Sequence, residues 1–133
     1  MTSDLQLNID QLRALALASA QVTRDCACQI DSYREWTRIA PSFPQAQMHT
    51  VGTLAGDPYV EATYVEYHPD GSNYWSPQAP VAIRHFPYNR CTVLQCEVCG
   101  RGCLSYVEAG GYYVEPRVRA LAGQQIVDVA VAE

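Results

Sequence analysis

Two of the six cysteines stand in the segment Cys96-Glu97-Val98-Cys99-Gly100, between two runs of strand-forming residues. Residues 91–96 and 104–108 are rich in β-branched, aliphatic and aromatic side chains, so we expect two strands joined by a tight turn. Gly100 permits a left-handed backbone just after the second cysteine, which closes such a turn. Two thiolates separated by two residues can bind one metal ion there. The segment therefore predicts a β-corner with a metal site.

This segment, about residues 91–108, resembles the zinc-ribbon family, in which a Cys-x-x-Cys-Gly turn joins two strands. The resemblance implies a tetrahedral structural zinc ion with Cys96 and Cys99 as two of its four ligands. A zinc ribbon takes its other two ligands from a second Cys-x-x-Cys, and this chain has none. The remaining ligands must therefore come from other positions.

Several side chains qualify as the other two ligands. Cys26-Ala27-Cys28 lies far upstream of the turn, and Cys91 precedes it by five residues and reaches the metal if its strand bends. We expect the ligand set to be Cys96 and Cys99 together with Cys91 and one of Cys26 or Cys28. Cys103, on the strand after the turn, is a further option. Imidazole is also a good zinc ligand, so His68 and His85 are options as well.

The same sulfurs have other interpretations. Cys91-x4-Cys96-x2-Cys99 has the spacing of three ligands of a plant-type [2Fe–2S] cluster, but the stiff residues between Cys91 and Cys96 favour a strand over a loop wrapped around a cluster. Thiol–disulfide exchange is disfavoured because such motifs usually place the first cysteine at a helix N-terminus, and glycines follow Cys99 here. Buried, inert cysteines are the simplest alternative.

The rest of the chain predicts an α+β fold in a single domain spanning residues 1–133. Residues 4–25 predict an amphipathic helix, because apolar residues recur every three or four positions and Ser3 and Gln6 have the spacing of a capping box. Residues 26–58 are loop-rich, and residues 59–131 are β-rich. We expect the helix to pack on a small antiparallel sheet that contains the cysteine hairpin.

Within the β-rich part, two turns separate the expected strands. His68-Pro69-Asp70-Gly71 predicts a turn because proline presets φ and glycine tolerates a positive φ. Gly110-Gly111 predicts a hairpin turn, so the runs after residue 91 form a three-strand meander. The expected strands are residues 59–67, 74–75, 81–83, 91–96, 104–108, 112–114 and 126–131.

Composition and charge restrict the environment and the partners. Hydrophobic residues make up 48% of the 133 residues and charged residues 17%, which is enough apolar material for a core. The net charge of −5 argues against non-specific binding to nucleic acid. No stretch approaches the roughly 20 apolar residues of a membrane-spanning helix, and acidic residues before residues 14–20 argue against an export signal. We therefore expect a cytoplasmic protein, in which cysteines are thiols or metal ligands.

No catalytic motif is evident, which favours a non-enzymatic role. Glu66-x-His68-x-Asp70 groups three polar side chains, but Pro69 and Gly71 favour a turn there. We expect a zinc-stabilised module that binds another protein; in its specific form it is an immunity-type antidote that masks a basic partner. The alternatives are a small zinc metalloenzyme that uses His68 and His85, and a nucleic-acid-binding zinc-ribbon protein that uses arginine and tyrosine around the turn.

Overall fold

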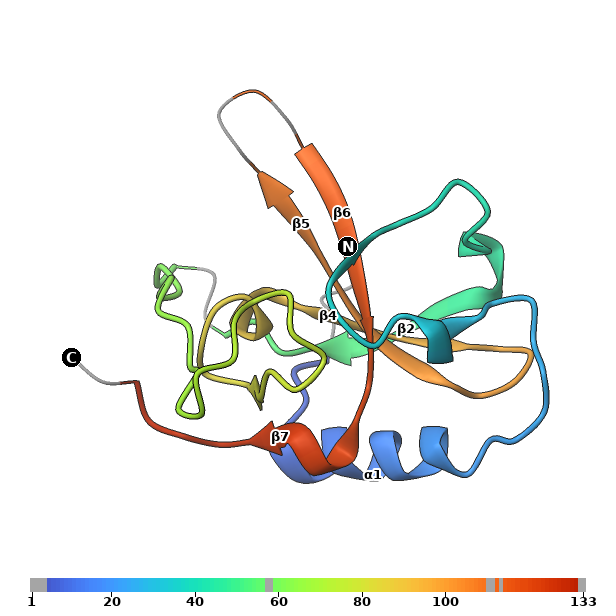
Figure 1. Ribbon diagram of the computed structural model, residues 1–133, viewed down its shortest axis with the longest axis horizontal. Coiled ribbons are helices and arrows are strands. Elements are labelled where there is room, and N and C mark those ends of the chain that lie inside the picture. Colours follow the sequence, from blue (N-terminus) through green and yellow to red (C-terminus); the bar gives the residue numbers. More distant parts are fainter. Residues whose placement is uncertain (1–4, 57–58, 110–111, 113, 132–133) are drawn as a thin grey trace.

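The computed structural model describes residues 5–56, 59–109, 112 and 114–131. In this part of the chain, the helix α1 (Ile9–Ala20) packs against a five-stranded antiparallel sheet of strand order β1-β6-β5-β4-β2 (Figure 1). Two further strands, β3 and β7, pair in parallel beside it. The α+β fold with an N-terminal helix packed on an antiparallel sheet is confirmed. The strands are β1 (Thr37–Arg38), β2 (Met48–Thr53), β3 (Val81–Ala82), β4 (Thr92–Cys96), β5 (Gly102–Ala109), β6 (Val114–Ala120) and β7 (Ile126–Val127).

α1 is shorter than its sequence pattern predicts, because its N-terminal cap lies further along the chain. The side chain of Asn8 accepts a hydrogen bond from Gln11 N at 2.8 Å, and Asn8 N donates to Gln11 Oε1 at 2.9 Å. This reciprocal pair is a capping box, and it starts the helix at Ile9. Of the expected box, Ser3 lies outside the described residues and Gln6 is not helical. The predicted bounds of residues 4–25 were therefore too wide.

The segment before α1 instead runs along the end of β2. Leu7 N donates to Thr53 O at 2.9 Å, and Thr53 N donates to Leu5 O at 2.8 Å. β2 itself lies within residues 26–58, where the sequence predicted loops. That prediction missed it because this strand carries polar, exposed residues on its outer side and is bulged between Thr50 and Gly52. Short polar strands give no clear alternation of apolar residues.

The prediction of a strand at residues 59–67 was wrong. Over residues 59–80 the described chain forms turns and irregular segments, and the expected strand at residues 74–75 is likewise a turn. Tyr59, Val60 and Tyr64 are exposed, because no strand of the described chain lies beside them to give a pleated surface on which they could pack. The predicted turn at residues 68–71 is confirmed: Gly71 N donates to His68 O at 3.3 Å, and Gly71 has a φ of 77°.

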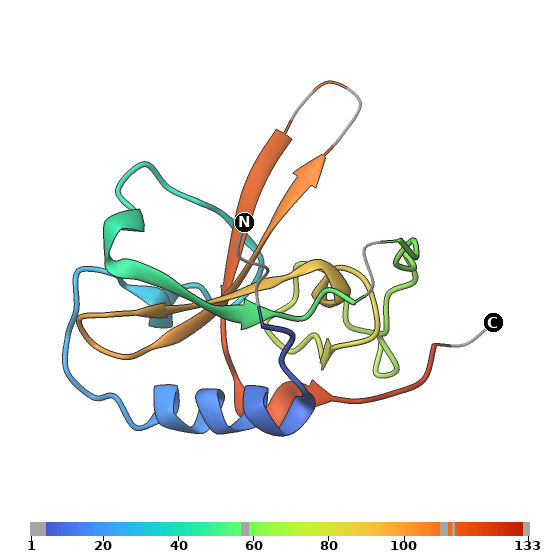
Figure 2. The same ribbon diagram turned by 180° about the vertical axis from the view of Figure 1, so that it is seen from behind.

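The predicted meander of β4, β5 and β6 is confirmed, with Leu104 of β5 paired between Val93 of β4 and Arg119 of β6. Its hairpin turn at residues 110–111 lies outside the described residues. The outer half of the β5–β6 hairpin projects beyond the rest of the sheet in both views (Figures 1 and 2). β3 and β7 match the strands expected at residues 81–83 and 126–131, although each is shorter.

Both faces of the sheet are buried around β4 and β5. Successive residues of a strand point to opposite faces, so neighbouring residues belong to different clusters. Leu104 and Val93 pack with Leu12 and Ala16 of α1 on one face. On the opposite face, Cys103 belongs to a second cluster, covered by the chain between α1 and β2. The buried members of this second cluster are Cys28, Ile30, Phe43, Cys96, Cys103 and Val118.

A buried arginine ties irregular chain to the sheet. Arg119 of β6 is fully buried, and its guanidinium donates to the carbonyl oxygens of Pro77 at 3.1 Å and Ala79 at 2.9 Å. It also donates to Gln125 Oε1 at 3.0 Å and to the hydroxyl of Tyr88. Within the described residues no carboxylate pairs with it, so neutral oxygens alone solvate the charge. The hydrophobic pattern of the sequence gave no sign of this role.

Gly52 marks the closest approach between β2 and the segment before α1. A Cβ atom on Gly52 would lie 2.4 Å from Leu5 O and 2.8 Å from Leu7 Cγ. We expect Gly52→Ala to lower the free energy of unfolding by about 1–3 kcal/mol, because backbone must shift to admit the methyl group. Chemical denaturation measures this. Gly56→Ala is the control, since its nearest neighbour, Gln6 Nε2, lies 3.9 Å away; an equal loss in both variants would contradict the prediction.

Candidate metal centre

The turn between β4 and β5 presents Cys96 and Cys99 as the sequence predicts. Cys96 N donates to Arg101 O at 2.9 Å, and Gly100 N donates to Cys96 O at 2.9 Å. Gly100 has a φ of 90°, the left-handed conformation expected after the second cysteine. These hydrogen bonds fold the turn back on itself.

Cys26 and Cys28 come from the segment that follows α1. Gln29 N donates to Cys26 O at 3.2 Å, and Gln29 has a φ of 52°, so the chain turns tightly just after Cys28. A short 3₁₀ helix, Ile30–Ser32, follows. In both views this segment, drawn in light blue, runs beside the orange turn between β4 and β5 at one end of the sheet (Figures 1 and 2). Two segments far apart in the sequence thus meet there.

The four sulfurs form one compact group. Sγ of Cys26 lies 3.8 Å from Sγ of Cys96, and Sγ of Cys28 lies 3.6 Å from Sγ of Cys99. All four atoms lie within 4.8 Å of one another. A tetrahedral ion with metal–sulfur bonds of about 2.3 Å holds its sulfurs about 3.8 Å apart. The group therefore has the donor type, the number of donors and the spacing of a four-cysteine metal site.

This group is set into the second apolar cluster. Cys28 and Cys96 are each 1% exposed, while Cys26 and Cys99 are half-buried. Among the described residues, no histidine or carboxylate joins the four sulfurs in a group that could hold a metal ion. Four protein ligands complete a tetrahedral coordination shell and leave no position for water or substrate. The arrangement is that of a closed site.

The sulfurs differ in how readily they lose a proton without a metal. A hydrogen bond from the backbone N–H of Cys28 lowers the pKa of Cys26 to about 7. Burial raises the pKa of Cys28 to about 12. A metal ion deprotonates the thiols that coordinate it, so binding here must displace the proton of the Cys28 thiol. The site is therefore one in which metal and protons compete.

Cys91, which we expected among the ligands, lies outside the group of four sulfurs. Its side chain is fully buried in the cluster beneath α1, and its Sγ donates to Pro87 O at 3.4 Å. Both Cys26 and Cys28 complete the group in its place. The ferredoxin-like spacing, which relied on Cys91, therefore does not describe this group. The sequence signal for the observed group was present in the paired spacing of Cys26-x-Cys28.

Cys103 also lies apart from the metal-capable group. It points into the second cluster from β5, and burial raises its pKa to about 12.

The histidines also lie outside the group of four sulfurs. His68 Nε2 lies 2.7 Å from Glu66 Oε1, and its Nδ1 lies 3.1 Å from Ser72 Oγ, so it braces the turn that the sequence predicts. His85 is buried against the ring of Tyr67, at 5.1 Å between ring centroids.

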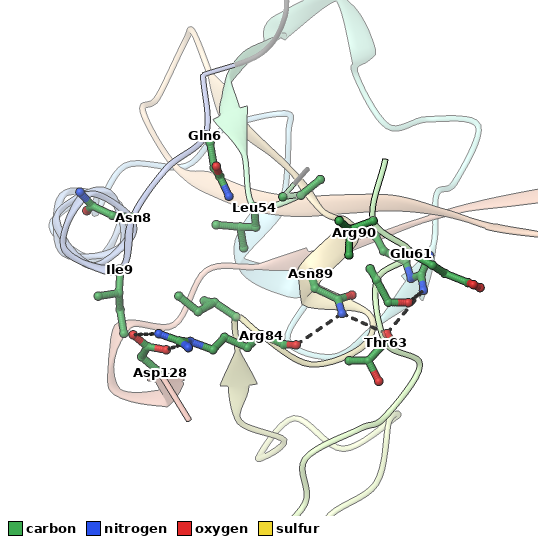
Figure 3. Close-up of a pocket in the computed structure, with 15 residues that line it drawn as sticks. Gln6, Asn8, Ile9, Leu54, Glu61, Thr63, Arg84, Asn89, Arg90 and Asp128 are labelled. Atoms are coloured by element: carbon green, nitrogen blue, oxygen red, sulfur yellow. Dashed lines mark hydrogen bonds and ion pairs between the residues drawn. The ribbon is translucent and has the colours of Figure 1, made fainter. Parts of the chain in front are cut away.

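A separate open cavity of about 870 Å³ lies between the start of α1, the end of β2 and residues 60–63 (Figure 3). On one side Arg84 pairs with Asp128, with Nη2 and Oδ2 3.3 Å apart. On the other side Asn89 and Arg90 both donate to Thr63 O, at 3.0 and 3.4 Å. The described lining contains neither cysteine nor histidine, so it offers no nucleophile–base pair of that kind.

Comparisons with protein-family models, with curated proteins and with solved structures gave no match to this chain. The likeness to zinc ribbons therefore stays limited to the turn and its flanking strands, and the site must be argued from its own geometry. Over the described residues, no helix has both the length and the apolar character needed to cross a membrane.

His85 gives a pH dependence that is independent of metal binding. Burial lowers the pKa of His85 below its ordinary value of 6.5, and its Nδ1 lacks a hydrogen-bond partner in the described structure. Below pH 6.5 the unfolded chain therefore binds a proton more readily than the folded chain, and stability falls as the pH is lowered. We expect His85→Phe to lose less unfolding free energy than the wild type between pH 7 and pH 5. Urea denaturation at each pH measures this, and equal losses would refute it.

Proposed function

We propose that this protein is a non-enzymatic binding module whose fold is completed by a structural zinc ion. The observation that carries the proposal is the compact group of four cysteine sulfurs at tetrahedral spacing. Tetrahedral sites of four thiolates hold zinc or iron–sulfur centres, and zinc suits a purely structural role because it has no redox chemistry. When bound, the ion would link Cys26 and Cys28 to Cys96 and Cys99.

The closed coordination shell supports a structural role over a catalytic one. Catalytic zinc sites keep an open position for water or substrate, whereas four protein ligands fill a tetrahedral ion. The metalloenzyme alternative requires His68 or His85 at the metal. His68 is engaged with Glu66 and Ser72, and His85 lies against Tyr67. Their positions in the fold therefore favour the non-enzymatic reading.

Zinc would stabilise the fold by joining distant parts of the chain. Cys26 and Cys96 are 70 residues apart, and the segment between α1 and β1 contains little regular structure. Structural zinc sites contribute apparent binding free energies of about 10–16 kcal/mol in small zinc-finger peptides near pH 7. A contribution of even part of that size is large beside the net stability of a small domain.

The projecting β5–β6 hairpin offers a surface for a protein partner. Val107 pairs with Pro116 across the hairpin, and both side chains, with that of Val114, are exposed on the same face. Their opposite face is polar, because Arg117 pairs with Glu115 at 2.9 Å there. Exposed apolar residues on a projecting element are typical of protein interaction sites. This supports protein binding over an unpartnered role.

Charge supports a basic partner. The chain carries a net charge of −5, which would speed its encounter with a positive protein surface. An immunity-type antidote that masks a basic toxin or enzyme is the specific form of the proposal. Retention of six thiols favours a reducing compartment such as the cytoplasm. Nucleic-acid binding is less favoured, since the overall charge is of the wrong sign.

The metal site has a direct test. We expect the purified protein to contain one zinc ion per chain and to melt at a lower temperature after treatment with a strong chelator, because the ion binds only the folded chain. Cys28→Ser and Cys99→Ser should each abolish zinc binding. Elemental analysis and thermal denaturation measure these effects.

Cys91→Ser is the matched control for Cys28→Ser, because Cys91 is as buried as Cys28 but lies outside the group. It should retain zinc. The proposal fails if the wild-type protein binds no metal and is unaffected by chelators. Iron in place of zinc, seen as strong visible absorption, would overturn the choice of metal.

The binding surface is tested by comparing two equally exposed apolar residues. Val107 on the hairpin is 58% exposed, and Leu17 on α1 is 64% exposed. We expect Val107→Glu to lose the partners that the tagged wild-type protein retains from its native host, because a charge replaces the apolar contact. Leu17→Glu should retain them. Capture at low and high salt followed by mass spectrometry measures this; absence of any partner at both salts, or equal retention by both variants, would contradict it.

A further inference from the structure

A zinc ion with four thiolates carries a net charge of −2, and here two of the sulfurs are 1% exposed. Water therefore cannot solvate the whole centre, so N–H donors from the protein must do so. Backbone groups supply some of them. Arg101 N lies 3.5 Å from the Cys99 sulfur, and the N–H groups of Cys28 and Ile30 face the sulfurs of Cys26 and Cys28.

Gln47 approaches the sulfurs of Cys26 and Cys96 from the end of a short 3₁₀ helix, just before β2. Its Oε1 lies 3.6 Å from the Cys96 sulfur and 3.9 Å from the Cys26 sulfur. Both contacts require thiols as donors. Once the sulfurs are thiolates they can only accept, and a half-turn of the amide presents its NH₂ group to them instead.

The position of Gln47 is fixed from the metal-binding turn itself. Glu97 N, in the residue after Cys96, donates to Gln47 O at 2.7 Å, and Gln47 N donates to Pro44 O at 3.0 Å. Gln47 therefore keeps its place beside the sulfurs when the amide turns.

Arg101 approaches from the other side, two residues after Cys99. It is 7% exposed; its Nη2 donates to Val22 O at 3.4 Å and lies 3.9 Å from Asp31 Oδ2. Its Nη1 is buried and has no hydrogen-bond partner in the described structure. A guanidinium N–H is thus free to bond a thiolate.

We infer that Gln47 and Arg101 are positioning residues that donate hydrogen bonds to the metal-bound sulfurs from opposite sides, Gln47 to Cys26 and Cys96, and Arg101 to Cys99. This inference rests on the proposed zinc site. It assigns one donor to each of the two close sulfur pairs, and the positive charge of Arg101 offsets part of the negative charge of the centre. Residues of this kind typically account for 10- to 100-fold in metal affinity.

Gln47→Glu is the sharper of the two tests, because it replaces a donor by a carboxylate that repels thiolates. We expect zinc affinity, measured by competition with a chromophoric chelator, to fall 10- to 100-fold. Gln45→Glu adds the same charge to the same 3₁₀ helix (Gln45–Gln47) at an exposed position and should leave the affinity within about twofold. Equal affinities for the two variants would overturn the role of Gln47.

Arg101→Met is expected to weaken zinc binding by a similar factor and to speed alkylation of the zinc-bound sulfurs by iodoacetamide, since a thiolate without its donor is more nucleophilic. Arg34→Met is the control, because Arg34 is exposed and lines the same surface cleft as Arg101. Arg101→Lys keeps the charge and one donor, so it should lie between wild type and Arg101→Met and carry the test if Arg101→Met does not fold.

The outcomes separate this inference from the proposed function. If the wild-type protein contains no zinc, the proposed metal site itself is refuted. If the wild-type protein binds zinc but Arg101→Met and Arg34→Met have the same zinc affinity and alkylation rate, the metal site stands and the role of Arg101 is refuted. Cobalt substitution gives an independent readout: the sulfur-to-cobalt charge-transfer bands should shift in Gln47→Glu and Arg101→Met, and unchanged bands would count against donation to sulfur.

Discussion

The Cys26–Cys28 segment meets the turn between β4 and β5 where the chain begins to cover the face of the sheet opposite α1. α1 covers one face, but the opposite face is closed by chain that contains little regular structure. Such chain has few backbone hydrogen bonds to hold it, so a cross-link at its start has a large effect. The four sulfurs meet at that point, 1% exposed at Cys28 and Cys96. A metal ion there would convert a loose covering into a fixed one.

Buried arginines perform a related task elsewhere in the molecule. The chain contains nine arginines and no lysine. Arg119 holds the carbonyl oxygens of Pro77 and Ala79 against the sheet, and Arg101 holds Val22 O beside the sulfurs. Arg117 lies over the ring of Trp75, 4.9 Å from its centroid. A planar guanidinium with five N–H donors can satisfy several carbonyls at once, which suits it to anchoring irregular chain.

The group of four sulfurs and the projecting hairpin are separate features of the molecule. The Cys26–Cys28 segment and the turn between β4 and β5 meet at one end of the sheet, and the hairpin of β5 and β6 projects away from the rest of the sheet (Figure 2). Pairing of Arg117 with Glu115 and Glu108 stiffens the polar face of that hairpin. The apolar face is thereby presented on a firm support. The candidate metal centre and the exposed apolar face of the hairpin therefore lie in different parts of the molecule, which is compatible with the proposed binding module.

The sequence by itself determined the features that depend on near neighbours. The turn at Cys96–Gly100, the meander and the existence of the N-terminal helix follow from glycine conformation, β-propensity and helical periodicity, which act over a few residues. Tertiary structure decided the rest. Residues 59–67 have strand-like composition but pair with no strand in the described part of the chain, and β2 gains its partner, β4, from far along the chain. That Cys26 and Cys28, and not Cys91, lie beside Cys96 and Cys99 was decided in the same way, because the path of the folded chain brings together residues 70 positions apart and local spacing does not.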